Sequence, residues 1–289
     1  IGNAKNLLSP FFIFLFQHSS IKFFARGFNS HLLLPKKRDK DFLVIKFGSK
    51  PIDIFFVFRI SLGILLGTIY ISQTIGITFT SANHSAFITC SAVIIVPIIL
   101  FLFGWEKFNK KQILSILMVA IGLVLLTLKS GLSGFNLGDL ITLAAAVICA
   151  IHIVFSGLYV RKFNFLSLIF YQFFFAGLVS FFSLFSKQAF YNFPPILFEN
   201  DAINNVLYLS LLGTLFCYFV TVWGQKHVST TFIALIFSLE PLFASVTNYL
   251  VLNEVFTTKE FIGAIIIFIG ILLYSIPKKW GSIFKNNLI

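Results

Sequence analysis

The sequence predicts an all-α integral membrane protein, and its composition and the length of its apolar runs support that prediction. Of its 289 residues, 58% are hydrophobic and 11% are charged, and the mean hydropathy is +0.95. A soluble domain carries about 25% charged residues, so this chain could not cover a water-facing surface. Several apolar runs exceed the ~20 residues that a helix needs to cross a bilayer core. Barrel strands would instead show ~10-residue stretches of alternating polarity.

Nine helical spans are expected, and their short connections predict that neighbouring helices run antiparallel. The first of them has only a short apolar core. The spans cover residues 7–24, 54–77, 81–103, 112–128, 138–160, 165–186, 203–224, 229–252 and 260–276.

Small residues within the spans predict close helix packing. Gly63 and Gly67 form a GxxxG pair, and Gly263 and Gly270 line one side of the last span. Three cysteines, Cys90, Cys149 and Cys217, lie inside apolar spans at irregular spacing, which is typical of neither a disulfide framework nor a zinc site.

Two stretches of the chain, residues 76–122 and 224–270, repeat one module at an offset of 148 residues. In each copy an apolar run is followed by a short charged turn opened by a glutamate, and then by a second apolar run. Repeats of membrane-length segments are typical of secondary transporters, which place their binding site where two halves meet. The pairs that mark the repeat are Gly76 with Gly224, Ser81 with Ser229, Glu106 with Glu254 and Gly122 with Gly270.

Lysine and arginine are distributed unequally between alternate loops. Seventeen fall on the side that holds the C-terminus and four on the other, while Arg59 lies within a span. The positive-inside rule therefore predicts a cytoplasmic C-terminus, and it explains the net charge of +12 without nucleic acid. Glu106 then lies in a cytoplasmic loop and Glu254 in an outer one. The two halves are thus inverted, as an odd number of helices per repeat requires.

The repeat divides the chain into a first half at 1–128 and a second half at 129–289. The offset places the counterpart of 165–186 at 17–38, where Lys22, Arg26 and other polar residues interrupt the apolar run. A charge at a helix centre costs about 2.5–3.5 kcal/mol on insertion scales. The counterpart of 138–160 would fall mostly before residue 1. We expect that the sequence of residues 1–50 is degraded relative to a membrane helix and that the first half lacks one helix. The alternative is a genuine nine-helix protein.

Polar residues inside the spans are the candidate substrate-binding groups. Glu240 is the acidic residue that lies well inside a span, and an intramembrane carboxylate suggests a functional site. Pro241 follows it and frees a backbone carbonyl nearby. His152 lies mid-helix among small residues that let another helix approach. For each, a structural hydrogen-bonding role is the alternative. The remaining candidates are Tyr70, Gln73, Asn83, Gln172 and Tyr218.

Catalytic motifs are absent from the sequence. It has no P-loop, HExxH or GxSxG, which argues against an ATP-driven pump or an enzyme within this chain. No catalytic residue, metal or cofactor is expected. The expected partners are a small-molecule substrate and the lipid bilayer, with protons, a counter-substrate or a second copy of the chain as further candidates.

The chain resembles the EamA type of the drug/metabolite transporter superfamily over residues 50–276. The resemblance rests on YISQTIGITFTSANHSAFIT (70–89), the FGWE turn (103–106), the stretch at 138–160, and SLEP within 211–244. It implies ten helices in two inverted five-helix repeats around a central cavity. It also implies a carrier in a bacterial inner or plasma membrane that moves a small polar metabolite, such as an amino acid, by alternating access. An exchanger of S-adenosylmethionine or nucleotide-like metabolites and a truncated remnant that does not transport are the alternatives.

Overall fold

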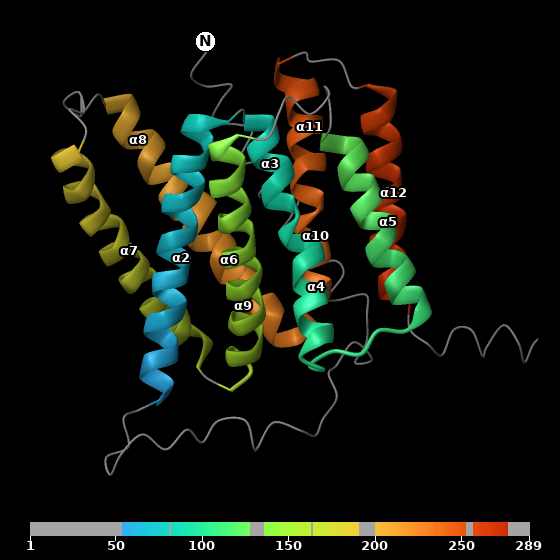
Figure 1. Cartoon of the computed structure of the whole chain (residues 1–289), viewed down its shortest axis with the longest axis horizontal. Coiled ribbons are helices and arrows are strands. Elements are labelled where there is room, and N and C mark those ends of the chain that lie inside the picture. Colours follow the sequence, from blue (N-terminus) through green and yellow to red (C-terminus); the bar gives the residue numbers. More distant parts are fainter. Residues whose placement is uncertain are drawn as a thin grey trace, which may run out of the picture.

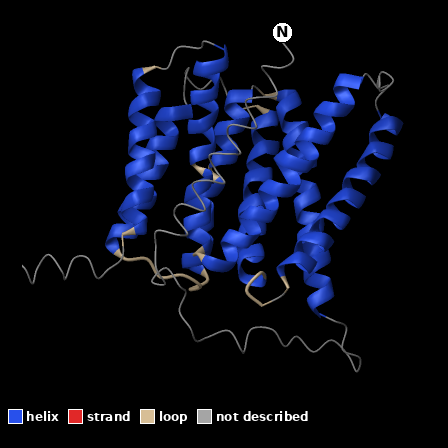
Figure 2. Ribbon diagram, turned by 180° about the vertical axis from the view of Figure 1, so that it is seen from behind, coloured by secondary structure: helices blue, strands red, loops and turns tan. Residues whose placement is uncertain are grey.

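The computed structural model describes residues 54–80, 82–127, 136–162, 164–190, 200–252 and 257–276 (Figure 1). Within these ranges the chain is helical and contains no strand (Figure 2). Five of the described helical segments are long and apolar enough to cross a membrane, and two shorter apolar segments accompany them. The all-α membrane fold expected from the sequence is confirmed.

Eight of the nine expected spans match described helices to within a few residues, and the ninth, 7–24, lies outside the described residues together with 17–38. The 203–224 span extends at both ends and contains a π-helical stretch, η1, in its middle. The elements are α2 (Ile54–Phe79), α3 (Ala82–Cys90), α4 (Ala92–Leu102), α5 (Lys110–Thr127), α6 (Leu137–Tyr159), α7 (Phe165–Phe190), α8 (Asn200–Tyr208), η1 (Leu209–Phe216), α9 (Cys217–His227), α10 (Thr230–Phe237), α11 (Leu239–Leu252) and α12 (Thr258–Ser275).

Two expected spans are each divided into two helices. A turn at Ser91 separates α3 from α4, and a turn at Ser238 separates α10 from α11. Pro241 explains the second break, because it has no N–H to donate to the carbonyl four residues earlier, that of Phe237. Phe237 is the last residue of α10. The backbone irregularity predicted beside Glu240 is therefore present.

Polar caps fix where several helices begin. Thr257 and Glu260 form a capping box at the start of α12. Asn109 and Gln112 exchange the same two bonds at the start of α5, at 2.9 and 3.0 Å. Each pair satisfies backbone N–H groups that a helix start leaves without partners. Asn109 and Gln112 precede Thr257 and Glu260 by 148 residues, so the repeat extends to the caps.

The helices obey the same offset. Lys110–Thr127 and Thr258–Ser275 correspond residue for residue, and Ile54–Phe79 corresponds to the segment formed by α8, η1 and α9. In Figure 1, α2 and the α8–η1–α9 segment run in opposite directions, as do α5 and α12. The matched helices of the two halves are inverted relative to each other, as the charge distribution predicted.

The contact between α5 and α12 is the most extensive helix–helix contact among the described residues. A Cβ atom on Gly122 would lie 2.8 Å from the carbonyl oxygen of Gly263. The counterpart pair under the offset, Gly270 and Ser115, also touches, since the Ser115 hydroxyl donates to the Gly270 carbonyl. Gly63 and Gly67 let α2 approach α7 in the same way. The predicted packing roles of all these glycines are confirmed, and α5 with α12 forms a contact that the internal symmetry maps onto itself.

Candidate functional site

Three of the candidate residues meet in a buried hydrogen-bonded cluster formed by α6, α7 and α9. The His152 Nε2 lies 3.1 Å from the Gln172 Oε1 and 3.3 Å from the Tyr218 hydroxyl. The Tyr218 hydroxyl also donates to the Gln172 Oε1. His152 is 4% exposed and Gln172 is fully buried. The cluster therefore links three helices through side chains that the sequence places in three separate apolar spans.

One polar atom of this cluster has no partner among the described residues. The Gln172 Nε2 is buried, and nothing described accepts a hydrogen bond from it. Exchanging the amide nitrogen and oxygen would give Nε2 the partners and leave the oxygen unpaired instead. An unpaired buried amide atom costs about 1–3 kcal/mol. One hydrogen-bonding position of the cluster is thus unfilled among the described residues.

Glu240 lies in the first turn of α11, next to the break at Ser238. Its side chain is exposed. The helix that carries it, α11, packs against α5, α10 and α12. Glu240 is therefore an exposed carboxyl beside the turn that separates α10 from α11.

Tyr70 lies on α2, and its side chain is 40% exposed. Gln73 is half-buried one turn further along α2. Asn83 lies on α3, but its side chain is outside the described residues. No group of three His, Cys, Asp or Glu side chains in the described part of the chain could hold a metal ion.

The structure buries a carboxylate that the sequence analysis treated only as a mark of the repeat. Glu106 is 8% exposed and accepts hydrogen bonds from the Thr230 backbone N–H at 3.2 Å and the Thr231 hydroxyl at 2.6 Å. It thus joins the turn after α4 to the start of α10, where a negative charge is favoured by the helix dipole. Burial raises the pKa of Glu106, and the Thr231 hydrogen bond and the Arg161 charge oppose that rise.

Arg161 fastens the same end of the bundle. Its guanidinium donates to the carbonyl oxygens of Gln225 at 3.2 Å and Val228 at 2.9 Å, and so ties the end of α6 to the end of α9. The sequence counted Arg161 only as a loop cation. The FGWE turn and its repeat partner are the signal that could have singled out Glu106, but the residues that it touches lie more than a hundred positions away in the chain.

The comparisons with known proteins agree on the family. The model of the EamA-like transporter family matches residues 136–276. A protein of Archaeoglobus fulgidus described as an uncharacterized transporter is 32% identical over 224 residues, which cover 76% of this chain and 68% of that protein. A Clostridium kluyveri protein with the same description is 29% identical over 245 residues, which cover 77% of this chain and 73% of that protein.

A solved structure described as "Crystal structure of protein" shares the fold. Its TM-score is 0.63, with 16% sequence identity, over 93% of this chain and 88% of that chain. The helix arrangement, the inverted repeat and the sequence relatives lead to one conclusion. The chain belongs to the EamA-like transporter family and is an integral membrane protein.

Proposed function

We propose that this protein is a secondary transporter that carries a small polar metabolite, such as an amino acid or a related compound, by alternating access. The observation that supports this most directly is the Glu240 carboxyl, which is exposed within an apolar span beside the break between α10 and α11. Intramembrane carboxylates are costly and mark substrate or proton pathways. Broken helices at the membrane midplane serve the same purpose in transporters, because their free backbone groups can coordinate a substrate.

In this proposal the two halves rock about the α5–α12 contact. That contact lies on the internal symmetry axis, and its small residues hold the two backbones close together. The α3–α4 and α10–α11 segments are the counterpart arms on either side of it, each interrupted by one turn. Rocking of the arms would open the region around Glu240 first to one face of the membrane and then to the other. The charge of the loops favours a cytoplasmic C-terminus.

Glu240 takes a proton or the amino group of the substrate in this mechanism. The cluster of His152, Gln172 and Tyr218 offers hydrogen bonds to polar substrate atoms, and the open position on the Gln172 amide favours that role. Tyr70, Gln73 and Asn83 are the remaining groups that we assign to the substrate path.

The test is flux into liposomes that contain the purified full chain. Radiolabelled amino acids, nucleosides and S-adenosylmethionine would be offered one at a time, with and without a pH gradient. Glu240→Gln should abolish the flux of whichever compound the wild type carries, with no change in expression. Glu260→Gln is the matched control, because Gln112 performs the same capping task at the start of α5.

Two results would contradict the proposal in different ways. Normal flux by Glu240→Gln would remove Glu240 from the mechanism while leaving a transporter. A wild type that moves none of the compounds, although correctly inserted, would favour a remnant that does not transport.

A further inference from the structure

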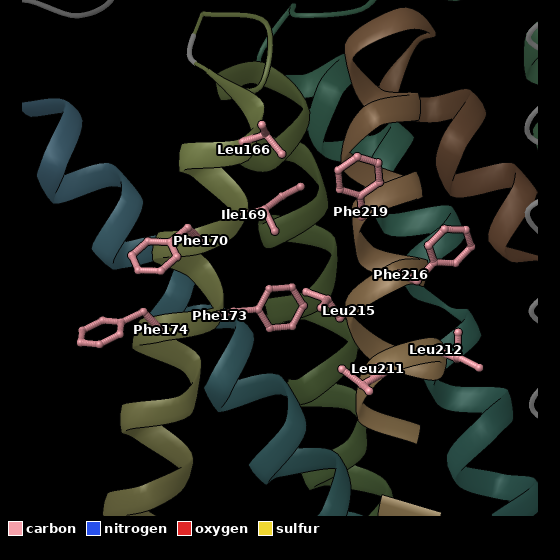
Figure 3. Close-up of a pocket in the computed structure, with 10 residues that line it drawn as sticks. All are labelled: Leu166, Ile169, Phe170, Phe173, Phe174, Leu211, Leu212, Leu215, Phe216 and Phe219. Atoms are coloured by element: carbon pink, nitrogen blue, oxygen red, sulfur yellow. The ribbon is translucent and has the colours of Figure 1, made fainter. Parts of the chain in front are cut away.

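An apolar groove of about 840 Å³ lies between α7 and the η1–α9 segment. Ten side chains line it, and all of them are Leu, Ile or Phe (Figure 3). Several are strongly exposed, among them Phe170 at 64%, Phe174 at 52% and Leu211 at 56%. In Figure 3, Leu166 and Phe219 lie near one end of the lining, and Leu211 and Leu212 lie near the other. The stretch Leu166–Phe174 covers roughly 12 Å along α7 at ~1.5 Å per residue.

One end of this groove carries a positive charge. The Lys226 ammonium lies 5.5 Å from the centre of the Phe165 ring, directly beside Leu166. Phe165 in turn packs edge-on against Phe219, which lines the groove, with 5.5 Å between ring centres. Lys226 is exposed, and Trp223 lies one turn before it on α9. Tryptophan and lysine together are typical of the level where lipid headgroups meet water.

The internal repeat shows that one wall of the groove differs from its counterpart on α2. Gly63 and Gly67 of α2 let α7 approach so closely that a Cβ atom on Gly63 would lie 2.6 Å from the Phe175 Cβ. Leu211 and Leu215 stand at the corresponding positions of η1, 148 residues later. Both line the groove, so η1 presents leucine side chains where α2 presents glycines.

We propose that the groove binds one acyl chain of an anionic membrane phospholipid, with the lipid phosphate at Lys226. The side chains of the lining supply no hydrogen-bond donor or acceptor, so a hydrocarbon chain suits the part of the ligand inside. The ammonium at the end supplies a charge for a phosphate, and basic residues at the ends of membrane helices bind lipid headgroups in this way. The bound chain would contact Phe173, whose ring packs edge-on against Tyr218 at 5.1 Å. The lipid would thus lie one side chain away from the buried polar cluster.

The occupant can be identified by photo-crosslinking the full chain in native membranes. The variant Phe216→p-benzoylphenylalanine places the reactive group on the groove wall, and the mass of the adduct after irradiation names the partner. The expected adduct is one phospholipid, attached through its acyl chain. An adduct with a second copy of the chain, or an internal crosslink to residues 17–38, would overturn the proposal.

The charge is tested separately by native mass spectrometry of the purified full chain titrated with phosphatidylglycerol or phosphatidylcholine. Lys226→Gln should weaken phosphatidylglycerol binding about fivefold, the contribution expected of one lysine near an anionic surface, and leave phosphatidylcholine binding unchanged. Leu215→Trp should reduce the binding of both lipids because it fills the groove.

The matched controls are Lys110→Gln, which removes an exposed charge from the start of α5, and Leu114→Trp, which enlarges an exposed apolar residue elsewhere. Neither should change binding. Equal affinity of the wild type for the two lipids, or equal effects of the control and groove variants, would refute the site. Since none of these readouts involves transport, the outcome is independent of the proposed flux.

Discussion

The close contact between α5 and α12 predicts that one added methyl group at Gly263 destabilises the protein. A Cβ atom on Gly263 would lie 2.7 Å from the Gly122 carbonyl oxygen and 2.8 Å from the Leu126 backbone nitrogen. Both atoms belong to the backbone of the facing helix, so neither can rotate away. Gly263→Ala therefore forces the two helices apart along a face that also buries Ile267 and Leu123.

The size of the effect follows from two opposing terms. Inserting a methyl group into a packed core costs about 1–3 kcal/mol. Alanine favours a helix over glycine by about 0.8–1.0 kcal/mol, which offsets part of that cost. The second term can be measured alone at Gly177 of α7, where an added Cβ atom meets nothing within 4 Å. The free energies of unfolding of Gly263→Ala and Gly177→Ala should differ by about 1–3 kcal/mol, with Gly263→Ala the less stable.

Reversible unfolding in mixed detergent micelles, followed by helix content, gives both values. Gly270→Ala should fall between them, because the nearest atom to its added Cβ is the Val119 Cγ2 at 2.8 Å, which can move. Equal stabilities of Gly263→Ala and Gly177→Ala would show that the two helices do not meet as described, and would remove the pivot from the proposed mechanism.

Two further predictions concern the buried polar groups. Burial raises the pKa of Glu106 when the protein folds, so the folded state holds the carboxyl proton more tightly than the unfolded chain does. The free energy of unfolding should therefore fall as the pH rises from about 4.3 through the pKa of Glu106 in the folded state. The variant Glu106→Gln should show a smaller loss of stability with pH, measured as the unfolding midpoint from about pH 4 to about pH 8. If the midpoint of the variant depended on pH as steeply as that of the wild type, Glu106 would not be the cause. Tyr218→Phe removes the hydroxyl that donates to Gln172, and should lower the free energy of unfolding by about 0.6 kcal/mol, the average for hydrogen bonds between membrane helices. A loss far above about 1.7 kcal/mol would mean that the hydroxyl supports more of the fold than this one bond.

Hydropathy was sufficient to place the helices, because a membrane span needs a long apolar run and little else. It could not place the turns at Ser91 and Ser238 or the π-helical stretch of η1. These interruptions change the backbone over one or a few residues without changing the apolar composition. Of these interruptions, only the turn at Ser238 could be expected from the sequence, because Pro241 lacks the backbone N–H that a continuous helix requires.

The site was predicted as a set of residues but not as an arrangement. His152, Gln172 and Tyr218 stand out individually as polar groups in apolar helices, yet their contact depends on how α6, α7 and α9 cross, which no spacing along the chain encodes.

The two halves have kept some positions of the repeat and changed others, and the pattern has a physical meaning. The caps Asn109–Gln112 and Thr257–Glu260 and the pair Gly122 and Gly270 lie at the α5–α12 contact, where each half is the partner of the other. A change there disturbs both halves at once. Gly63 and Leu211 occupy corresponding positions away from that contact, and each meets its own surroundings. Such positions are free to differ: Gly63 admits α7 closely to α2, whereas Leu211 lines the apolar groove. The symmetry of the fold therefore constrains the proposed pivot, while the proposed lipid site uses residues that differ between the halves.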